Sequence, residues 1–194
     1  MMSSLNKLFV VLMLLLLAGC GNFSLGDSRI EGTVLDDSTS KPVEGAIVIA
    51  QWKGEIHGIV DGSSICYHTE TSLTDVNGKF AIPAWNRVPM DHMEKAVTEK
   101  KRSITVYMEG YNNRGLVPLM DGSGSIRIKR ATATGEKRLQ DIGIGVDYGC
   151  SGADDSLVQL NLLSERRCAE RNALFREMGR QVERCQPPYE KRIR

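Results

Sequence analysis

The chain has 194 residues, of which 41% are hydrophobic and 25% charged, and this composition excludes both a disordered chain and an integral membrane bundle. Lysine and arginine count 25 against 24 acidic residues, so the formal net charge is only +1. Because a nearly neutral chain has no overall electrostatic attraction to phosphate backbones, we expect no nucleic-acid partner.

The amino terminus has the pattern of an export signal. It is short and polar up to Lys7, and an unbroken apolar run follows over residues 8–17. This run is shorter than the roughly 20 residues of a membrane-spanning helix, so residues 1–19 are predicted to be a cleaved signal peptide. The run ends in the letters LAGC, closing at Cys20, which resemble the bacterial lipoprotein box. The resemblance implies diacylglycerol on the Cys20 thiol and a fatty acid such as palmitate on its amine, and therefore a lipid anchor.

The residue after this cysteine is Gly21. In lipoproteins of Gram-negative bacteria an aspartate at that position retains the protein at the inner membrane. The resemblance therefore implies transport to the outer membrane, with the protein facing the periplasm. Residues 20–27 are expected to be a tether of glycine, serine and aspartate character.

Residues 28–135 are predicted to form a mainly β domain, because short β-rich runs alternate with turn residues. The run over residues 43–52 is dense in β-branched side chains and predicts a buried strand, whereas residues 79–82 alternate polar and apolar side chains. The letters DVNG at 75–78 predict a hairpin turn in which Gly78 takes positive φ. Further strands are predicted at 30–34, 67–74, 103–108 and 125–129.

Three segments in this domain resemble the carboxypeptidase regulatory-like domain: GTVLD at 32–36, KPVEGAIV at 41–48 and TDVNGKFAI at 74–82, with Gly110-Tyr111 later in the chain. The resemblance covers about residues 28–130 and implies a prealbumin-like sandwich of about seven strands. Its motifs are structural: glycines for turns and close approach, and a proline in a loop. It therefore implies a fold and no activity.

Two segments depart from a compact version of that domain. Residues 53–64 form a glycine-rich insertion that contains His57, and residues 86–102 form a charged insertion with helical propensity that contains His92. Because binding residues are often carried on loops of a rigid scaffold, His57 and His92 are candidate ligand-binding residues. Trp52, Tyr67 and Trp85 are further candidates as an aromatic platform for sugars, although tryptophan more often fills a core.

The sequence contains no motif that predicts an enzyme. A phosphate-binding glycine loop, a G-x-S-x-G elbow and an H-E-x-x-H motif are all absent, and we expect no cofactor. His57, Cys66 and His68 have ligand chemistry, but an exported cysteine more often forms a disulfide, so no metal site is predicted. The DVNG segment resembles the start of a calcium-binding loop, but when Asp75 is counted as position 1 of an EF-hand, position 12 is Asn86 and not the required glutamate. Acidic pairs at 36–37 and 154–155 are interpreted as turn and helix-start residues.

The carboxyl-terminal region is predicted to be a connector over residues 136–163, a helix over residues 164–186 packed on the sandwich, and a tail over residues 187–194. An apolar stripe at helical spacing supports this helix, and two prolines end it. The stripe consists of Cys168, Phe175, Met178, Val182 and Cys185.

Four cysteines remain after lipidation, and an even number in an exported chain predicts two disulfides with three possible pairings. They are Cys66, Cys150, Cys168 and Cys185. A continuous helix would separate Cys168 from Cys185 by about 25 Å, too far for a bridge. The favoured pairing is therefore Cys66–Cys185 with Cys150–Cys168, unless the helix breaks at Gly179.

These patterns together predict a lipid-anchored, non-catalytic binding or structural module of the cell envelope. The expected fold is mainly β, a prealbumin-like seven-stranded β-sandwich with a C-terminal α-helix packed on it. The expected partners are the membrane, through the lipid on Cys20, and an envelope protein or glycan. The alternative function is an accessory lipoprotein that binds a glycan or recruits a partner enzyme.

Overall fold

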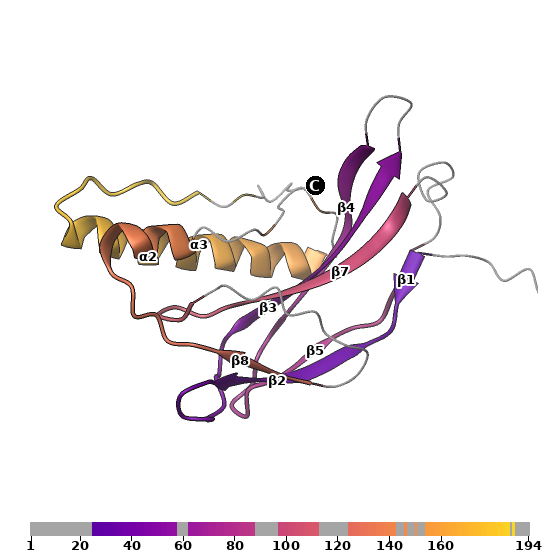
Figure 1. Ribbon diagram of the computed structural model, residues 1–194, viewed down its shortest axis with the longest axis horizontal. Coiled ribbons are helices and arrows are strands. Elements are labelled where there is room, and N and C mark those ends of the chain that lie inside the picture. The colour runs from indigo at the N-terminus through magenta and orange to yellow at the C-terminus, as the bar shows by residue number, and fades with distance from the viewer. Residues whose placement is uncertain are drawn as a thin grey trace, which may run out of the picture.

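The computed structural model describes residues 25–57, 62–87, 97–112, 124–142, 146, 150, 154–186 and 188. The predicted signal peptide, Cys20 and Gly21 lie outside these residues. The described chain forms eight strands and two helices (Figure 1). They are β1 (Leu25–Asp27), β2 (Ile30–Asp36), β3 (Ile47–His57), β4 (Gly62–Leu73), β5 (Lys79–Ile82), β6 (Trp85–Arg87), β7 (Val97–Tyr107), β8 (Gly124–Ile128), α2 (Gly135–Ile142) and α3 (Asp154–Glu177).

The strands form two three-stranded sheets and one two-stranded ribbon. One sheet has the order β5-β2-β8, in which β2 pairs antiparallel with β5 and parallel with β8. The other has the order β4-β3-β7 and is antiparallel throughout, and β1 pairs with β6 in the ribbon. In Figure 1, α3 lies along one side of the β4-β3-β7 sheet and the β5-β2-β8 sheet lies on the other side. The prediction of a mainly β fold with a C-terminal helix is confirmed.

Strand β3 is buried on both faces. Val48 and Ala50 belong to the core between the two sheets, while Ile47 and Ile49 pack against α3, and all four are fully buried. A strand covered on both sides needs apolar residues at consecutive positions, which explains the unbroken apolar run in the sequence. The core under α3 contains Ile47, Ile49, Tyr107, Val146, Leu160 and Leu163.

Glycine at position 32 allows β2 to lie close to its neighbours. A Cβ atom there would lie 2.6 Å from the Gly124 carbonyl oxygen and 2.7 Å from the Phe80 ring. No side chain fits at such distances, so glycine at this position allows β8 and the Phe80 ring to lie close to β2, as the motif predicts.

The turn at residues 75–78 forms as predicted, but it does not close a hairpin. The Asp75 carboxylate accepts hydrogen bonds from the backbone N–H groups of Asn77 and Lys79, both at 2.8 Å, and Gly78 has φ +70°. The strands on either side, β4 and β5, belong to different sheets. The hairpin prediction is wrong because β5 pairs with β2 and not with β4. The turn itself is bonded to β2, since the Val34 N–H donates to the Gly78 carbonyl at 2.8 Å.

The described parts of the two predicted insertions are strand. β3 and β4 continue as one long hairpin to the pair His57 and Gly62, with a register shift at Trp52/Lys53, so the segment 53–64 is mostly paired backbone. In the second insertion, residues 97–102 pair with β3 and are not helical, because β-branched Val97 and Thr98 extend the sheet. His92 lies outside the described residues.

Two predicted boundaries and the predicted number of strands need correction. Residues 25–27 of the expected tether form β1, paired with β6. The expected connector contains α2 and the start of α3, because α3 begins at Asp154 and buries Leu160 and Leu163 against the sheet. The two main sheets contain six strands between them, where seven were expected.

The predicted disulfide pairing is wrong, because α3 ends at Glu177 and the chain turns back. Gly179 has φ +69°, and the N–H of Arg180 donates to the Phe175 carbonyl (2.8 Å), which is a common way for a helix to end. The bridges are Cys66–Cys150 and Cys168–Cys185, with Cα atoms 4.9 and 5.7 Å apart. The break at Gly179 thus removes the continuous helix on which the expected pairing depended.

Residues 180–186, here called the C-terminal strap, run back along α3 (Figure 1). Asn172 on the helix holds the strap through two 2.9 Å hydrogen bonds, accepting from the N–H and donating to the carbonyl of Glu183. Val182 and Cys185 therefore lie on the strap, and the helical stripe predicted through them ends near Met178.

Candidate functional site

The three aromatic candidates lie in the core. Trp52, Tyr67 and Trp85 are only 4%, 6% and 9% exposed, and their rings pack with centroids 5.2 Å (Trp52–Trp85) and 6.2 Å (Tyr67–Trp85) apart. The Trp52 indole N–H donates to Asp27 of β1 at 2.7 Å. The expected sugar platform is therefore not present, because β3, β4 and β6 turn these rings toward each other and away from solvent.

His68 joins this aromatic cluster. Its ring stacks on Trp85 with centroids 3.8 Å apart and planes 22° apart, and its Nε2 lies 3.0 Å from Oε1 of Glu70. The backbone of His57 ends β3, but the side chain of His57 and all of His92 lie outside the described residues.

Ser156, Glu70 and His68 form a hydrogen-bonded chain whose order is unlike that of a catalytic triad. The Ser156 hydroxyl donates to the Glu70 carboxylate (2.7 Å), and the carboxylate contacts His68 on its other oxygen. Nucleophilic catalysis needs the histidine between the hydroxyl and the acid, so that a base touches the hydroxyl. Burial opposes ionisation of Glu70, but the hydrogen bonds from His68 and Ser156 outweigh it and lower its pKa. These hydrogen bonds connect the start of α3 to β4.

The metal alternative for Cys66 and His68 is not supported, since Cys66 is bonded to Cys150. In the part of the chain that the structure describes, no group of three His, Cys, Asp or Glu side chains is arranged to hold a metal ion.

Asp36 is a turn acid, as predicted, and also an acceptor for distant groups. Its carboxylate caps the N–H groups of Ser38 (2.9 Å) and Thr39 (3.0 Å), and accepts from the Tyr111 hydroxyl (2.8 Å) and Arg130 (3.0 Å). The hydrogen bonds from Ser38 and Tyr111 hold its pKa well below the ordinary value for aspartate.

Glu170 is a second buried acceptor. It accepts from the Tyr107 hydroxyl (2.9 Å), the Gly110 N–H (3.3 Å) and Arg138 Nε (3.1 Å). Burial and the neighbouring carboxylate raise the pKa of Tyr107. Glu170 and Arg138 were not candidates in the sequence, because their pairing joins residues 32 positions apart and leaves no local signal.

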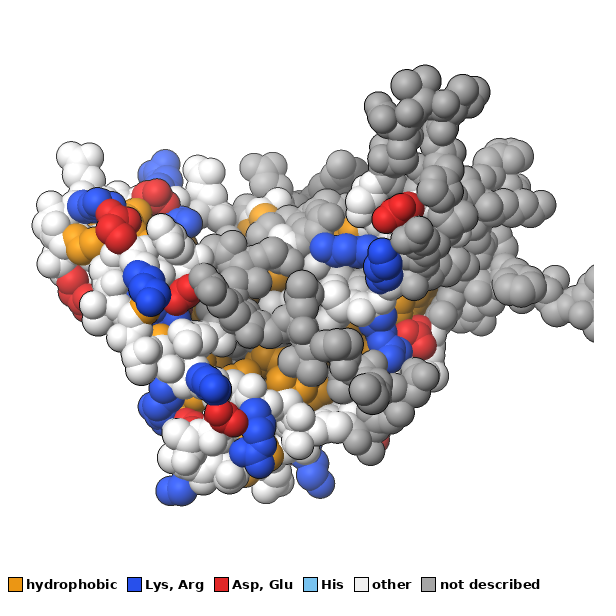
Figure 2. Space-filling view, viewed as in Figure 1, with side chains coloured by type: hydrophobic (Ala, Val, Ile, Leu, Met, Phe, Trp, Pro, Cys, Tyr) orange, Lys and Arg blue, Asp and Glu red, His pale blue; other side chains and the backbone are white. Residues whose placement is uncertain are grey.

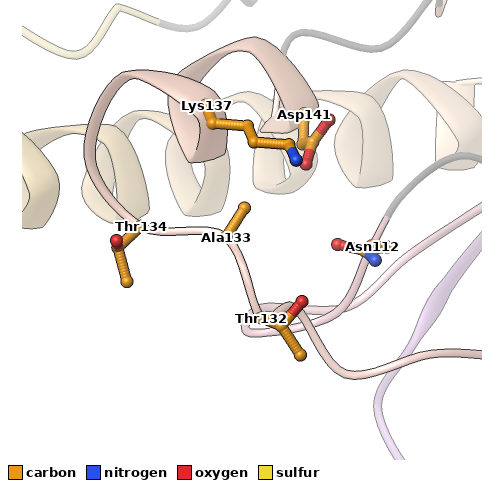
Figure 3. Close-up of a pocket in the computed structure, with 6 residues that line it drawn as sticks. All are labelled: Asn112, Thr132, Ala133, Thr134, Lys137 and Asp141. Carbon is orange, nitrogen blue, oxygen red and sulfur yellow. The ribbon is translucent and has the colours of Figure 1, made fainter.

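An open polar cleft of about 490 Å³ lies beside α2 (Figure 3). Lys137 and Asp141 project from α2 toward one another, Asn112 lies across from them, and the segment leading into α2 forms the remaining wall (Figure 3). The lining residues are Asn112, Thr132, Ala133, Thr134, Lys137 and Asp141. None of them was a candidate in the sequence, because the cleft exists only where two distant segments meet.

Charges on the described surface are mixed. Figure 2 shows basic and acidic side chains interspersed on one face of the molecule. Several form ion pairs, such as Arg171–Glu183 at 2.6 Å and Lys129–Asp37 at 3.7 Å. Among the described residues, no helix is both long enough and apolar enough to cross a bilayer.

Comparisons with known proteins give little further information. No protein-family model matches the chain, and no curated protein matches it. Two solved structures are similar at a low level: a 9R-lipoxygenase from Cyanothece PCC8801 (11% identity, TM-score 0.32) and a chlorocatechol 1,2-dioxygenase from Pseudomonas putida (13% identity, TM-score 0.31). The matches cover 78% and 57% of this chain, and 24% of the lipoxygenase and 62% of the dioxygenase. This chain thus spans less than two thirds of either protein, and likeness at this level supports no argument about activity.

Proposed function

We propose that this protein is a lipid-anchored, non-catalytic binding or structural module of the bacterial cell envelope, held at the outer membrane and facing the periplasm. The observation that carries the proposal is the lipoprotein box ending at Cys20, followed by a domain with two disulfides. Disulfides persist in oxidising compartments such as the periplasm and are rare in the cytosol. The cysteines and the signal sequence therefore point to the same compartment.

The described domain begins very close to the proposed anchor. Leu25, the first residue of β1, follows Cys20 by five positions, which extended chain spans in at most about 18 Å. Asp27 fixes β1 to the sandwich by accepting hydrogen bonds from Trp52 and Arg102, both at 2.7 Å. Figure 1 places β1 and α2 at opposite ends of the domain. An anchored domain would therefore hold β1 next to the membrane and α2 away from it.

A non-catalytic role is supported by how the polar side chains are used. The buried polar side chains form hydrogen bonds that join separate elements of the fold. They are Ser156, Glu70, Asp36 and Glu170. These polar groups hold elements of the fold together, which is the use expected of them in a structural module.

We also propose that the two sheets form a prealbumin-like sandwich of the carboxypeptidase regulatory-like kind. The support is the role of the motif glycines: Gly32 permits close approach, and Gly78 and Gly110 take positive φ, +70° and +76°.

Fractionation of the bacterial envelope tests the anchor and its location. We expect the wild-type protein in the outer membrane, the Cys20→Ser variant released from membranes, and the Gly21→Asp variant retained at the inner membrane. Membrane fractionation that is the same for Cys20→Ser and wild type would overturn the proposal.

A further inference from the structure

The two disulfides differ in the exposure of their cysteines. In the first, Cys150 is only 4% exposed, and Cys66 is partly buried within β4, where it pairs with Lys53 of β3. In the second, Cys168 is buried on α3, but Cys185 is exposed on the C-terminal strap. Because thiol–disulfide exchange requires a thiolate to reach a sulfur atom, the Cys168–Cys185 bridge is the more accessible of the two to a reductant.

The C-terminal strap depends on this bridge more than on its other contacts. Residues 180–186 are all exposed, and Val182, the large apolar side chain among them, is 51% exposed, so the strap buries little apolar surface. Its ion pairs to α3 (Arg171–Glu183) and to α2 join side chains that are each at least 42% exposed, and such pairs add little stability. Ordering the strap costs backbone entropy at every position. Reduction of the bridge is therefore expected to release the strap.

The side chain of Asn172 on α3 contacts both the strap and the two sulfur atoms. Its amide nitrogen lies 2.9 Å from the Glu183 carbonyl oxygen, 3.5 Å from Cys185 Sγ and 3.7 Å from Cys168 Sγ. Asn172 follows Cys168 by one helical turn, so it stays beside Cys168 when the strap leaves. Its N–H group, released from Glu183, can then donate to the Cys168 thiolate. A stabilised thiolate is a better leaving group, so this contact favours opening of the bridge.

We infer that Cys168–Cys185 is a thiol–disulfide exchange site, which a dithiol reductant opens, and that its opening releases the C-terminal strap from α3. The inference concerns the domain itself and does not depend on the lipid anchor.

The exchange begins at the exposed cysteine. A thiolate of the reductant attacks Cys185 Sγ, the S–S bond breaks, and its electron pair goes to Cys168 Sγ, which takes up a proton. The second thiol of the reductant then loses its proton and attacks the mixed disulfide, which frees Cys185 as a thiol and leaves the reductant as a disulfide. The protein gains two electrons and two protons, and exchange with an oxidising disulfide runs the same steps in reverse.

Timed reduction of the full chain, purified in detergent, tests the exchange. The protein is incubated with dithiothreitol, free thiols are trapped with a maleimide, and the labelled cysteines are located by peptide mapping. We expect Cys168 and Cys185 to be labelled about tenfold faster than Cys66 and Cys150, because access of the thiolate controls the rate. Reduced glutathione, a monothiol, should form its mixed disulfide on Cys185 and leave the thiol on Cys168. Equal rates at the two bridges, or glutathione on Cys168, would overturn the inference.

Amide hydrogen exchange, measured by NMR, tests the release of the strap. The Glu183 N–H donates to Asn172 Oδ1 at 2.9 Å, and it should exchange about tenfold faster once the Cys168–Cys185 bridge is reduced. The Val34 N–H, which donates to the Gly78 carbonyl at 2.8 Å, should keep its protection and thus show that the rest of the domain stays folded.

Variants separate the bridge from the other contacts of the strap. Cys168→Ser combined with Cys185→Ser should lose protection at Glu183 without any reductant. Arg171→Ala removes only the exposed ion pair to Glu183 and should retain that protection. If the double variant does not fold, the reduced wild-type protein decides. Protection of Glu183 that survives selective reduction of the bridge would overturn the inference, whatever the fractionation of the protein.

Discussion

Arg138 on α2 and Glu170 on α3 form an ion pair whose side chains are only 4% and 10% exposed. The same carboxylate accepts from the Tyr107 hydroxyl at 2.9 Å, so one buried charge connects α2, α3 and β7. Burying two charges is costly, and removing one partner leaves the other without compensation. Loss of either partner is therefore expected to destabilise the packing of α2 and α3 on each other.

We expect Glu170→Ala to lower the free energy of unfolding by about 3–5 kcal/mol, because Arg138 would remain buried without its partner. Glu183→Ala, which removes the exposed pair with Arg171, should cost less than about 1 kcal/mol. Urea denaturation of both variants checks this, and equal losses would contradict a special role for the buried pair.

Asp36 predicts a specific dependence of stability on pH. Because its pKa is lowered in the folded state, its ionised form contributes stability that is fully present above the unfolded pKa of about 3.9 and is lost as the pH falls toward the folded pKa. Asp36→Asn should therefore be less stable than wild type at pH 7, and the difference should shrink below about pH 4. Urea denaturation at pH 7, 4, 3 and 2 measures the difference. A gap that stays constant over this range would contradict the argument.

Peptide mapping should identify the two disulfides, and their removal should lower the free energy of unfolding by different amounts. Peptide mapping without reduction should yield a Cys66–Cys150 and a Cys168–Cys185 linked peptide, and a Cys66–Cys185 peptide would contradict the fold. Replacing Cys168 and Cys185 together by serine should cost about 3 kcal/mol, and replacing Cys66 and Cys150 about 4–5 kcal/mol, because the second bridge closes the longer loop.

Two glycines in the left-handed region provide a matched comparison. At Gly45, with φ +71°, a Cβ atom would meet nothing within 4 Å, so Gly45→Ala should cost only the backbone strain of about 1–2 kcal/mol. At Gly78, with φ +70°, a Cβ atom would lie 2.5 Å from the Val34 carbonyl oxygen. Gly78→Ala should therefore cost about 1–3 kcal/mol more. Thermal or urea denaturation that ranks the two variants equally would argue against the close approach of the turn to β2.

The elements predicted correctly from sequence are those with local signals. β3 and β5 follow from runs of β-branched or alternating residues, and the turn at Gly78 follows from its residue types. The end of α3 had a local signal too, Gly179, but the helical spacing of Val182 and Cys185 obscured it.

The features missed from sequence depend on contacts between distant segments. β1 is three residues long and exists because it pairs with β6, about sixty positions away. The burial of Trp52 and Trp85, which removed the expected sugar platform, likewise results from tertiary packing. The cleft at Asn112 and Lys137 needs two segments that no periodicity connects.

Intact-mass spectrometry of the protein extracted from bacterial membranes tests whether the chain is a lipoprotein anchored through Cys20. We expect a mature chain that begins at Cys20, with the mass of a diacylglyceryl group and an amide-linked fatty acid added, and with two disulfides. The Cys20→Ser variant should lack the lipid mass. A chain that begins at another residue, or that begins at Cys20 without lipid, would rule out the lipid anchor.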